Sequence, residues 1–287
     1  MKKAINIFRL SIILIILLFF SACDNRKKDS VKPSEFIKIK SLKEINKNEK
    51  IVAKNEGAKI EQLAFELSEL TNVLNDFEFE LKANLIAQKM WDFSYEDRKS
   101  INILDPLFVS EFTNIIKNAK TILKFSKPLS VGLANEKDMK SLIDILLYAD
   151  TISANPLEKS KINSLIAFMY NRMLDFNTQL YYSRKQFNYA KQSDDKQAII
   201  KAYGSLTQTL ANLDNRNEAL KLCDEISNVA PDYSAYFKCQ CQPLAPKEID
   251  NTIAMYEKLV RRKDICKDVR NMAEGDLRML KRHKTTK

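Results

Sequence analysis

AYGSLTQTLANLDNRNEALKLCDEISNVAPDY, residues 202–233, is the stretch that decides the fold. Its large apolar side chains recur at three- and four-residue steps through Tyr203, Leu206 and Leu210, which is the period of a helix with one buried face. Asp214 and Asn215 interrupt the pattern, a second amphipathic run follows, and Pro231 stops it. The stretch therefore predicts two antiparallel helices joined by a short turn.

The same stretch resembles a tetratricopeptide repeat. The positions that carry the resemblance are the large apolar residues of the first helix, the small residue where the helices approach, and the proline that ends the second helix: Tyr203, Leu206, Leu210, Ala219 and Pro231. Thr207 stands where glycine is usual and Cys223 where an aromatic residue is usual. With a weaker echo upstream, the resemblance extends over about residues 158–262.

Further helical runs separated by short, breaker-rich gaps flank this hairpin. They cover 138–153, 157–176, 178–192, 196–213, 216–229, 233–240, 247–262 and 267–282. Only four glycines occur, and alternating apolar runs are rare, so strands are poorly supported. The predicted fold is all-α, with antiparallel helical hairpins stacked as a short tetratricopeptide-like solenoid and residues 267–282 as its cap.

The region before the repeats is predicted with less detail. Apolar residues step by three and four from Ile60 to Leu81, which predicts one helix with a heptad seam. That seam has two interpretations, a packing face within the chain or the interface of a homodimer. A second helix is expected over 107–125, and residues 128–135 are expected to form a loop.

The amino terminus has the pattern of an export signal. Lys2 and Lys3 precede an apolar run that is too short to span a membrane, and it ends at Ser21-Ala22-Cys23. This ending resembles the lipobox of bacterial lipoproteins, although Phe20 replaces the usual leucine. The resemblance implies cleavage before Cys23, lipid on that cysteine and a durable membrane anchor. A secretory signal cleaved near Ala22 or an uncleaved anchor are the alternatives.

The resemblance also implies a location. Asp24 resembles the signal that retains enterobacterial lipoproteins at the inner membrane, so we expect a lipid-anchored protein that faces the periplasm. The predicted organisation is a signal peptide at 1–22, a lipidated cysteine and basic tether at 23–59, an N-terminal helical region at 60–157, helical repeats with a capping helix at 158–282, and a basic tail at 283–287.

The charge and the catalytic inventory argue against two classes of function. The net charge of +10 is concentrated in the first 59 residues and in 278–287, so a basic nucleic-acid-binding body is not indicated. His283 is the single histidine, and the dispersed glycines cannot form a phosphate loop. No enzyme activity, cofactor or metal is predicted, although a carboxylate-dependent cell-wall hydrolase stays an alternative, as does an exclusion or immunity lipoprotein of a mobile element.

Four cysteines remain after Cys23 is assigned to the lipid: Cys223, Cys239, Cys241 and Cys266. An even number in an exported chain favours disulfides, and the two with i,i+2 spacing are poorly placed to bond to each other within a helix. The remaining pairings join Cys239 and Cys241 to Cys223 and Cys266. Buried thiols and a four-cysteine zinc site are the alternatives.

Binding residues follow from the repeat resemblance. In tetratricopeptide repeats ligands lie along the groove formed by the first helices, and the groove-facing positions here are Lys201, Gly204, Ser205, Gln208 and Asn212. Lys201, Gln208 and Asn212 could meet a peptide backbone or carboxylate, or they could be ordinary polar surface. We therefore expect a non-enzymatic lipoprotein that binds an envelope protein or peptide as a scaffold.

Overall fold

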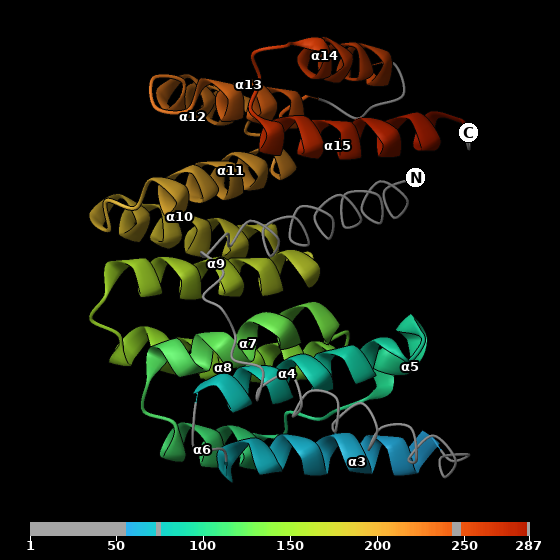
Figure 1. Ribbon diagram of the computed structural model, residues 1–287, viewed down its shortest axis with the longest axis vertical. Coiled ribbons are helices and arrows are strands. Elements are labelled where there is room, and N and C mark those ends of the chain that lie inside the picture. The colour runs from blue at the N-terminus through green and yellow to red at the C-terminus, as the bar shows by residue number, and fades with distance from the viewer. Residues whose placement is uncertain (1–55, 73–75, 243–247, 286–287) are drawn as a thin grey trace, which may run out of the picture.

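The computed structural model describes residues 56–72, 76–242 and 248–285 and contains only helices in these ranges. The helices are α3 (Glu56–Ser68), the 3-10 turn η2 (Glu69–Asn72), α4 (Asp76–Trp91), α5 (Tyr95–Ser100), α6 (Pro106–Ile115), α7 (Ala119–Gly132), α8 (Glu136–Ile152), α9 (Pro156–Arg172), α10 (Phe176–Gln192), α11 (Lys196–Asn212), α12 (Arg216–Ile226), α13 (Pro231–Gln240), α14 (Ile249–Arg261) and α15 (Lys267–Thr285). They are stacked along the long axis, from α3 at one end to α14 at the other (Figure 1). The predicted all-α fold of stacked helical hairpins is confirmed.

The central hairpins share one turn geometry. Leu174, Asp194 and Asp214 follow the C-terminal residues of α9, α10 and α11, and each has a positive φ. After α9 the amide of Asp175 donates to the carbonyl of Tyr170, which is the bond that closes a helix with a left-handed residue. The Asp175 side chain then accepts the amide of Thr178 and starts α10. Each turn thus reverses the chain in three residues.

Two hydrophobic cores lie along the stack. The N-terminal core extends into α9, where Ile162, Ile166 and Met169 are buried with Phe112 and Phe125. The C-terminal core is formed by α11 to α15, around buried residues that include Leu210, Tyr236 and Val269. The predicted regions 60–157 and 158–282 therefore share α9, whose apolar side belongs to the first core.

Polar side chains are buried between these two large cores, beside a small apolar cluster of Ala190, Ala198 and Ala202. Helix α10 packs between α9 and α11, and this buries three of its polar residues: Gln179, Ser183 and Gln186. The Ser183 hydroxyl lies 3.1 Å from that of Thr209 on α11, and only part of the remaining polar groups find partners. Burying polar side chains stabilises a fold less than burying apolar ones. The stack is therefore held there largely by its close helix contacts and turns.

The structure differs from the prediction in the N-terminal region. The expected single helix over 60–81 ends at Ser68, and α4 begins at Asp76 in another register. Leu63, Leu67 and Leu70 are buried within the chain, whereas Phe77 is 69% exposed. The seam is therefore not a continuous apolar face, and the buried leucines of α3 pack within the chain. The homodimer stays a prediction.

Two further boundaries were wrong. The expected helix over 107–125 is divided between α6 and α7, and Asn118 caps the start of α7 by accepting the amides of Lys120 and Thr121. Pro128 lies inside α7 instead of starting a loop. Its neighbours Phe125 and Leu129 are fully buried, and we attribute the continued helix to that burial, which offsets the hydrogen bond that proline cannot donate.

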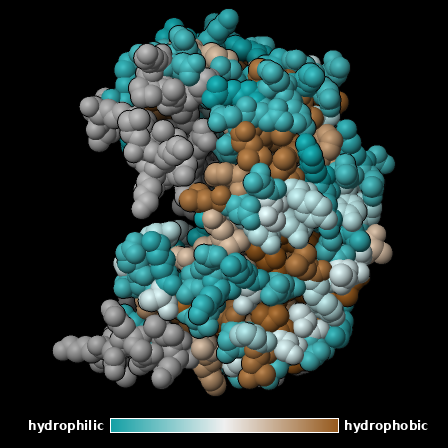
Figure 2. Space-filling view, turned by 180° about the vertical axis from the view of Figure 1, so that it is seen from behind, coloured by the Kyte–Doolittle hydropathy of each residue, from teal (hydrophilic) through white to brown (hydrophobic). Residues whose placement is uncertain are grey.

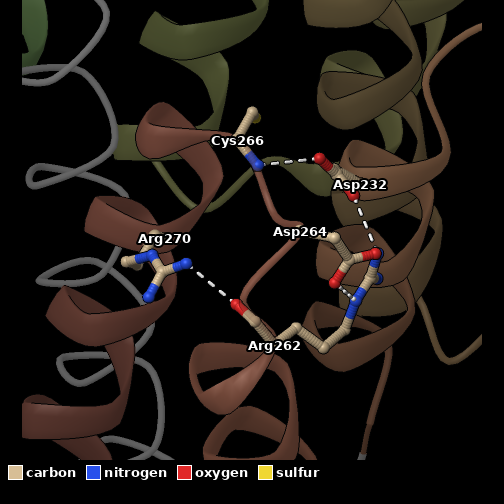
Figure 3. Close-up of polar contacts among 5 residues, drawn as sticks. All are labelled: Asp232, Arg262, Asp264, Cys266 and Arg270. Carbon is tan, nitrogen blue, oxygen red and sulfur yellow. Dashed lines mark hydrogen bonds and ion pairs between the residues drawn. The ribbon is translucent and has the colours of Figure 1, made fainter.

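The last two helices are fixed by a polar cluster around the α14–α15 connection (Figure 3). Arg262 contacts Asp232 of α13 at 3.1 Å and Asp264 at 2.8 Å. The other oxygen of Asp232 accepts the amide of Cys266 at 2.8 Å, and Arg270 of α15 donates to the carbonyl of Arg262. The connection is therefore bound to the first turn of α13. The predicted capping helix, α15, packs against α13 and α14, and α14 lies at the end of the stack (Figure 1).

Candidate functional site

A small pocket opens where α11 meets the helices of the C-terminal end. Its lining comes from α11, the start of α12, α13 and its C-terminal end, α14 and α15: Gln208, Ala211, Asn212, Arg216, Cys239, Gln240, Cys241, Gln242, Thr252, Tyr256, Asp276 and Leu280. The cavity volume is about 50 Å³, enough for a water molecule or the tip of a side chain and too small for a cofactor.

Two of the three predicted groove residues line this pocket. Gln208 and Asn212 are one helical turn apart on α11 and both face it. Lys201 lies near the start of the same helix, is exposed and is not part of the lining. Helix α11 therefore presents its C-terminal half to the pocket. Fewer of its residues line the pocket than the sequence predicted.

The other positions predicted to face the groove are used in packing. Gly204 lies under the ring of Phe237 of α13, and Ser205 lies 3.4 Å from the hydroxyl of Ser183 on α10. Contacts with α13 and α10 thus occupy part of the surface of α11 at these two positions, which are partly buried. The sequence alone does not show which helices pack against these two positions.

A buried carboxylate lies beside the pocket. Asp276 is 2% exposed, and its Oδ2 accepts the hydroxyls of Tyr236 at 2.9 Å and Tyr256 at 3.1 Å. Gln240 donates to the Tyr236 hydroxyl at 2.9 Å. Burial raises the pKa of Asp276 to about 6, and the hydrogen bonds from the tyrosines offset part of that rise. These residues are distant in sequence, and no local motif could have indicated them.

The pocket combines donors with one acidic group. The side-chain nitrogen of Asn212 is buried and has no hydrogen-bond partner in the described structure. Arg216 is partly exposed and contacts Asp214 at 3.5 Å. Asp276 is the only carboxylate in the lining, whereas glycoside hydrolysis ordinarily needs a pair about 5–9.5 Å apart. This lining is suited to holding a polar group, and it offers no second acid for that reaction.

The four cysteines of the body are free thiols in the structure. Cys223, Cys239 and Cys241 are buried near one another, and the thiols of Cys223 and Cys241 share a hydrogen bond that lowers the pKa of Cys223 and raises that of Cys241. Cys266 is exposed on the α14–α15 connection. The predicted disulfides are thus not formed here, although one predicted pair, Cys223 and Cys241, lies in contact.

The remaining site predictions are not tested by this geometry. Cys23, Asp24 and the signal peptide lie outside the described residues. No grouping of three or more candidate metal ligands occurs in the part of the chain that the structure describes. Nor is any helix within those ranges both long enough and apolar enough to cross a membrane.

Comparisons with known proteins add little to this geometry. No family model and no curated protein matches the chain. Among solved structures, the crystal structure of the P58(IPK) TPR domain is similar at 12% sequence identity, covering 79% of each chain with a TM-score of 0.23. A TM-score this low carries no argument about function, so the class of protein defined here, an all-α stack of helical hairpins, rests on the helices themselves.

Proposed function

We propose that this protein is a non-enzymatic scaffold that binds a partner protein at the pocket beside α11 and is held at a membrane by lipid on Cys23. The observation that carries the proposal is the buried, unpartnered side-chain nitrogen of Asn212 in the pocket beside α11. An unsatisfied buried donor costs about 1–3 kcal/mol, and a carbonyl or carboxylate of a partner would remove that cost.

A protein partner fits this pocket better than a small metabolite. The cavity of about 50 Å³ admits only the tip of a side chain, so most of the binding energy must come from the surface around it. Figure 2 shows apolar side chains along the middle of the rear face of the stack, between hydrophilic margins. An apolar centre with a polar rim is typical of a protein interface, so this face supports a protein partner for the stack as a whole.

Membrane attachment is proposed from the sequence. The Ser21-Ala22-Cys23 ending implies a lipidated cysteine, and Asp24 implies retention at the inner membrane if the organism is Gram-negative. Labelling with radioactive palmitate tests the anchor, since label that persists in Cys23→Ala would exclude lipidation at this residue. Loss of the label together with release from membranes is the expected result.

Partner binding is tested by crosslinking in intact cells. The double variant Gln208→Ala/Asn212→Ala removes both polar groups that α11 contributes to the pocket, and we expect it to reduce partner recovery about tenfold. The matched control is Gln88→Ala/Asn114→Ala, which makes the same changes at exposed positions of α4 and α6. Equal recovery with the two double variants would reject the pocket as the binding site.

The hydrolase alternative has its own test. Purified protein is incubated with peptidoglycan, and soluble muropeptides are measured by chromatography. The proposal predicts none above the level of a heat-denatured sample. Release of muropeptides would show that the protein is a hydrolase and would reject the proposal of a non-enzymatic scaffold.

A further inference from the structure

Two arginines meet at the C-terminal turn of α7, in the N-terminal part of the stack and away from the pocket. Arg98 of α5 donates to the carbonyl of Gly132 at 3.2 Å. Arg172, the last residue of α9, donates through Nη1 to the carbonyls of Ser130 and Val131. The two side chains thus come from distant segments and bind consecutive carbonyls of one helix end.

These two cations lack an acidic partner among the described residues. Two other arginines of the stack have acidic partners: Arg184 contacts Glu218 at 3.1 Å, and Arg262 contacts Asp232 at 3.1 Å. The end of α7 supplies only about half an elementary negative charge to the pair. More than one positive charge therefore stays uncompensated at this helix end.

Burial makes this excess charge costly. Arg98 is 7% exposed, and desolvation lowers its pKa. Desolvation also lowers the pKa of Arg172 to about 10, to which the neighbouring Arg98 contributes. Buried charges in proteins are ordinarily paired, and a single unpaired one strongly destabilises the fold. An anion bound here would relieve that cost.

Arg172 is positioned to receive such an anion. It is only partly buried, and its Nε and Nη2 have no hydrogen-bond partner within the described ranges. A guanidinium presents its remaining N–H groups in a fixed plane that matches the two oxygens of a carboxylate. Arg98 lies deeper and adds positive potential without needing direct contact.

Aromatic rings flank the pair. The guanidinium carbon of Arg98 lies 4.2 Å from the ring centre of Trp91 and 5.8 Å from that of Tyr95. Trp91 is 45% exposed and Tyr95 is 53% exposed, so both rings offer apolar surface beside the charges. A bare inorganic anion would leave those rings uncovered, whereas a peptide can place a carboxylate on Arg172 and an apolar side chain on the rings.

We propose that Arg98, Arg172, Trp91 and Tyr95 form a docking site for an acidic segment of a partner protein, in which an aspartate or glutamate binds Arg172 and an adjacent apolar side chain covers Trp91 and Tyr95. The site shares no residue with the pocket beside α11. It therefore stands or falls independently of that pocket.

The single tryptophan of the chain makes the test direct. Trp91 lies in the site, so its fluorescence reports binding there without an added label. The full-length chain in detergent is titrated with the peptide Ac-Asp-Leu-Glu-Phe-NH₂, with its neutral counterpart Ac-Asn-Leu-Gln-Phe-NH₂, and with inorganic phosphate. The expected result is saturable binding of the acidic peptide that weakens with added salt. Tight binding of the neutral peptide, or equal binding of phosphate alone, would overturn the proposal.

Variants assign the effect to Arg172. We expect Arg172→Gln to weaken binding of the acidic peptide at least about tenfold, and Arg172→Lys to weaken it less because the charge is kept. Arg184→Gln is the matched control, since it removes a paired arginine from α10. Circular dichroism checks that each variant is folded, and Arg172→Lys supplies the result if Arg172→Gln is not. Unchanged affinity in the folded Arg172 variants would also overturn the proposal.

Discussion

A Cβ atom built on Gly204 lies 2.8 Å from the ring of Phe237, closer than such atoms approach in folded proteins. The hairpin of α11 and α12 is followed directly by α13, and this contact fixes how closely α13 packs across α11. Phe237 is 4% exposed, so its ring has little room to move away. A missing side chain therefore sets the spacing at the centre of the C-terminal core.

Gly204→Ala should consequently destabilise the protein by about 1–3 kcal/mol, because overpacking outweighs the gain in helix propensity. The matched control is Gly132→Ala, where the new methyl group would meet its nearest neighbour, the sulfur of Met90, at 3.4 Å. We expect that variant to be neutral or slightly more stable. Urea unfolding of both variants measures the difference, and equal stability would show that the spacing at Phe237 is not tight.

A second prediction concerns pH. Burial raises the pKa values of Asp138 and Asp276 to about 6 from an ordinary value of 3.8. Both groups hold their proton more tightly in the folded state, so the stability they contribute is fully present below about pH 4. It is lost as the pH rises through 6. A shift of about two units corresponds to about 3 kcal/mol for each group.

The protein should therefore unfold at a higher urea concentration at pH 5 than at pH 7.5. Asp276→Asn should remove about half of that difference, because it leaves Asp138 as the remaining carboxylate of this kind. Asp268→Asn, at an exposed position of the same helix, serves as the control. A pH dependence that is identical in wild type and Asp276→Asn would contradict the assignment.

A third prediction concerns the turn after α9. Leu174 has a φ of 64°, a conformation that costs a non-glycine residue about 1 kcal/mol or more. Leu174→Gly should therefore raise the stability by up to about 1 kcal/mol. Leu213→Gly, at the C-terminal end of α11 where φ is −90°, should lower it. Thermal unfolding of the two variants decides, and a loss of stability in both would mean that the Leu174 side chain matters more than its backbone.

A fourth prediction orders the thiols by reactivity. Cys266 is exposed, whereas burial raises the pKa of Cys239 to about 12 and so suppresses its thiolate. In the folded, reduced protein a maleimide should modify Cys266 well before Cys239, as mass spectrometry of tryptic peptides would show. Equal rates at these two residues would mean that the C-terminal core opens readily. The protein is also unfolded without reductant and treated with the maleimide. If Cys223 and Cys241 then fail to react, they are joined by a disulfide.

The sequence predicted the helices from α8 onward because strong breakers separate them. Asp214-Asn215 and Pro231 delimit α12, and the structure begins that helix at Arg216. In the N-terminal region the apolar period outweighed the marker. Asn75-Asp76 lies at the start of α4, but Leu74, Phe77 and Leu81 continue the apolar steps of the preceding residues. The chain changes register there, and a period alone cannot show that one helix has ended and another has begun.

The candidate sites divide in the same way. Gln208 and Asn212 could be predicted because they lie on one face of one helix. Asp276 and Tyr256 reach the same pocket from α15 and α14, and Arg98 meets Arg172 across the end of α7. Such contacts arise from tertiary packing between distant segments. They cannot be predicted from a single sequence that contains no motif for them.

A photocrosslinking amino acid placed at position 208 would show whether a partner protein binds at the pocket beside α11. In intact cells we expect a defined adduct that is absent when the same amino acid is placed at exposed position 88 of α4. The adduct should also be lost when Asn212→Ala is added to the position-208 chain. The same adducts from both positions, or an adduct at position 208 that persists with Asn212→Ala, would contradict it.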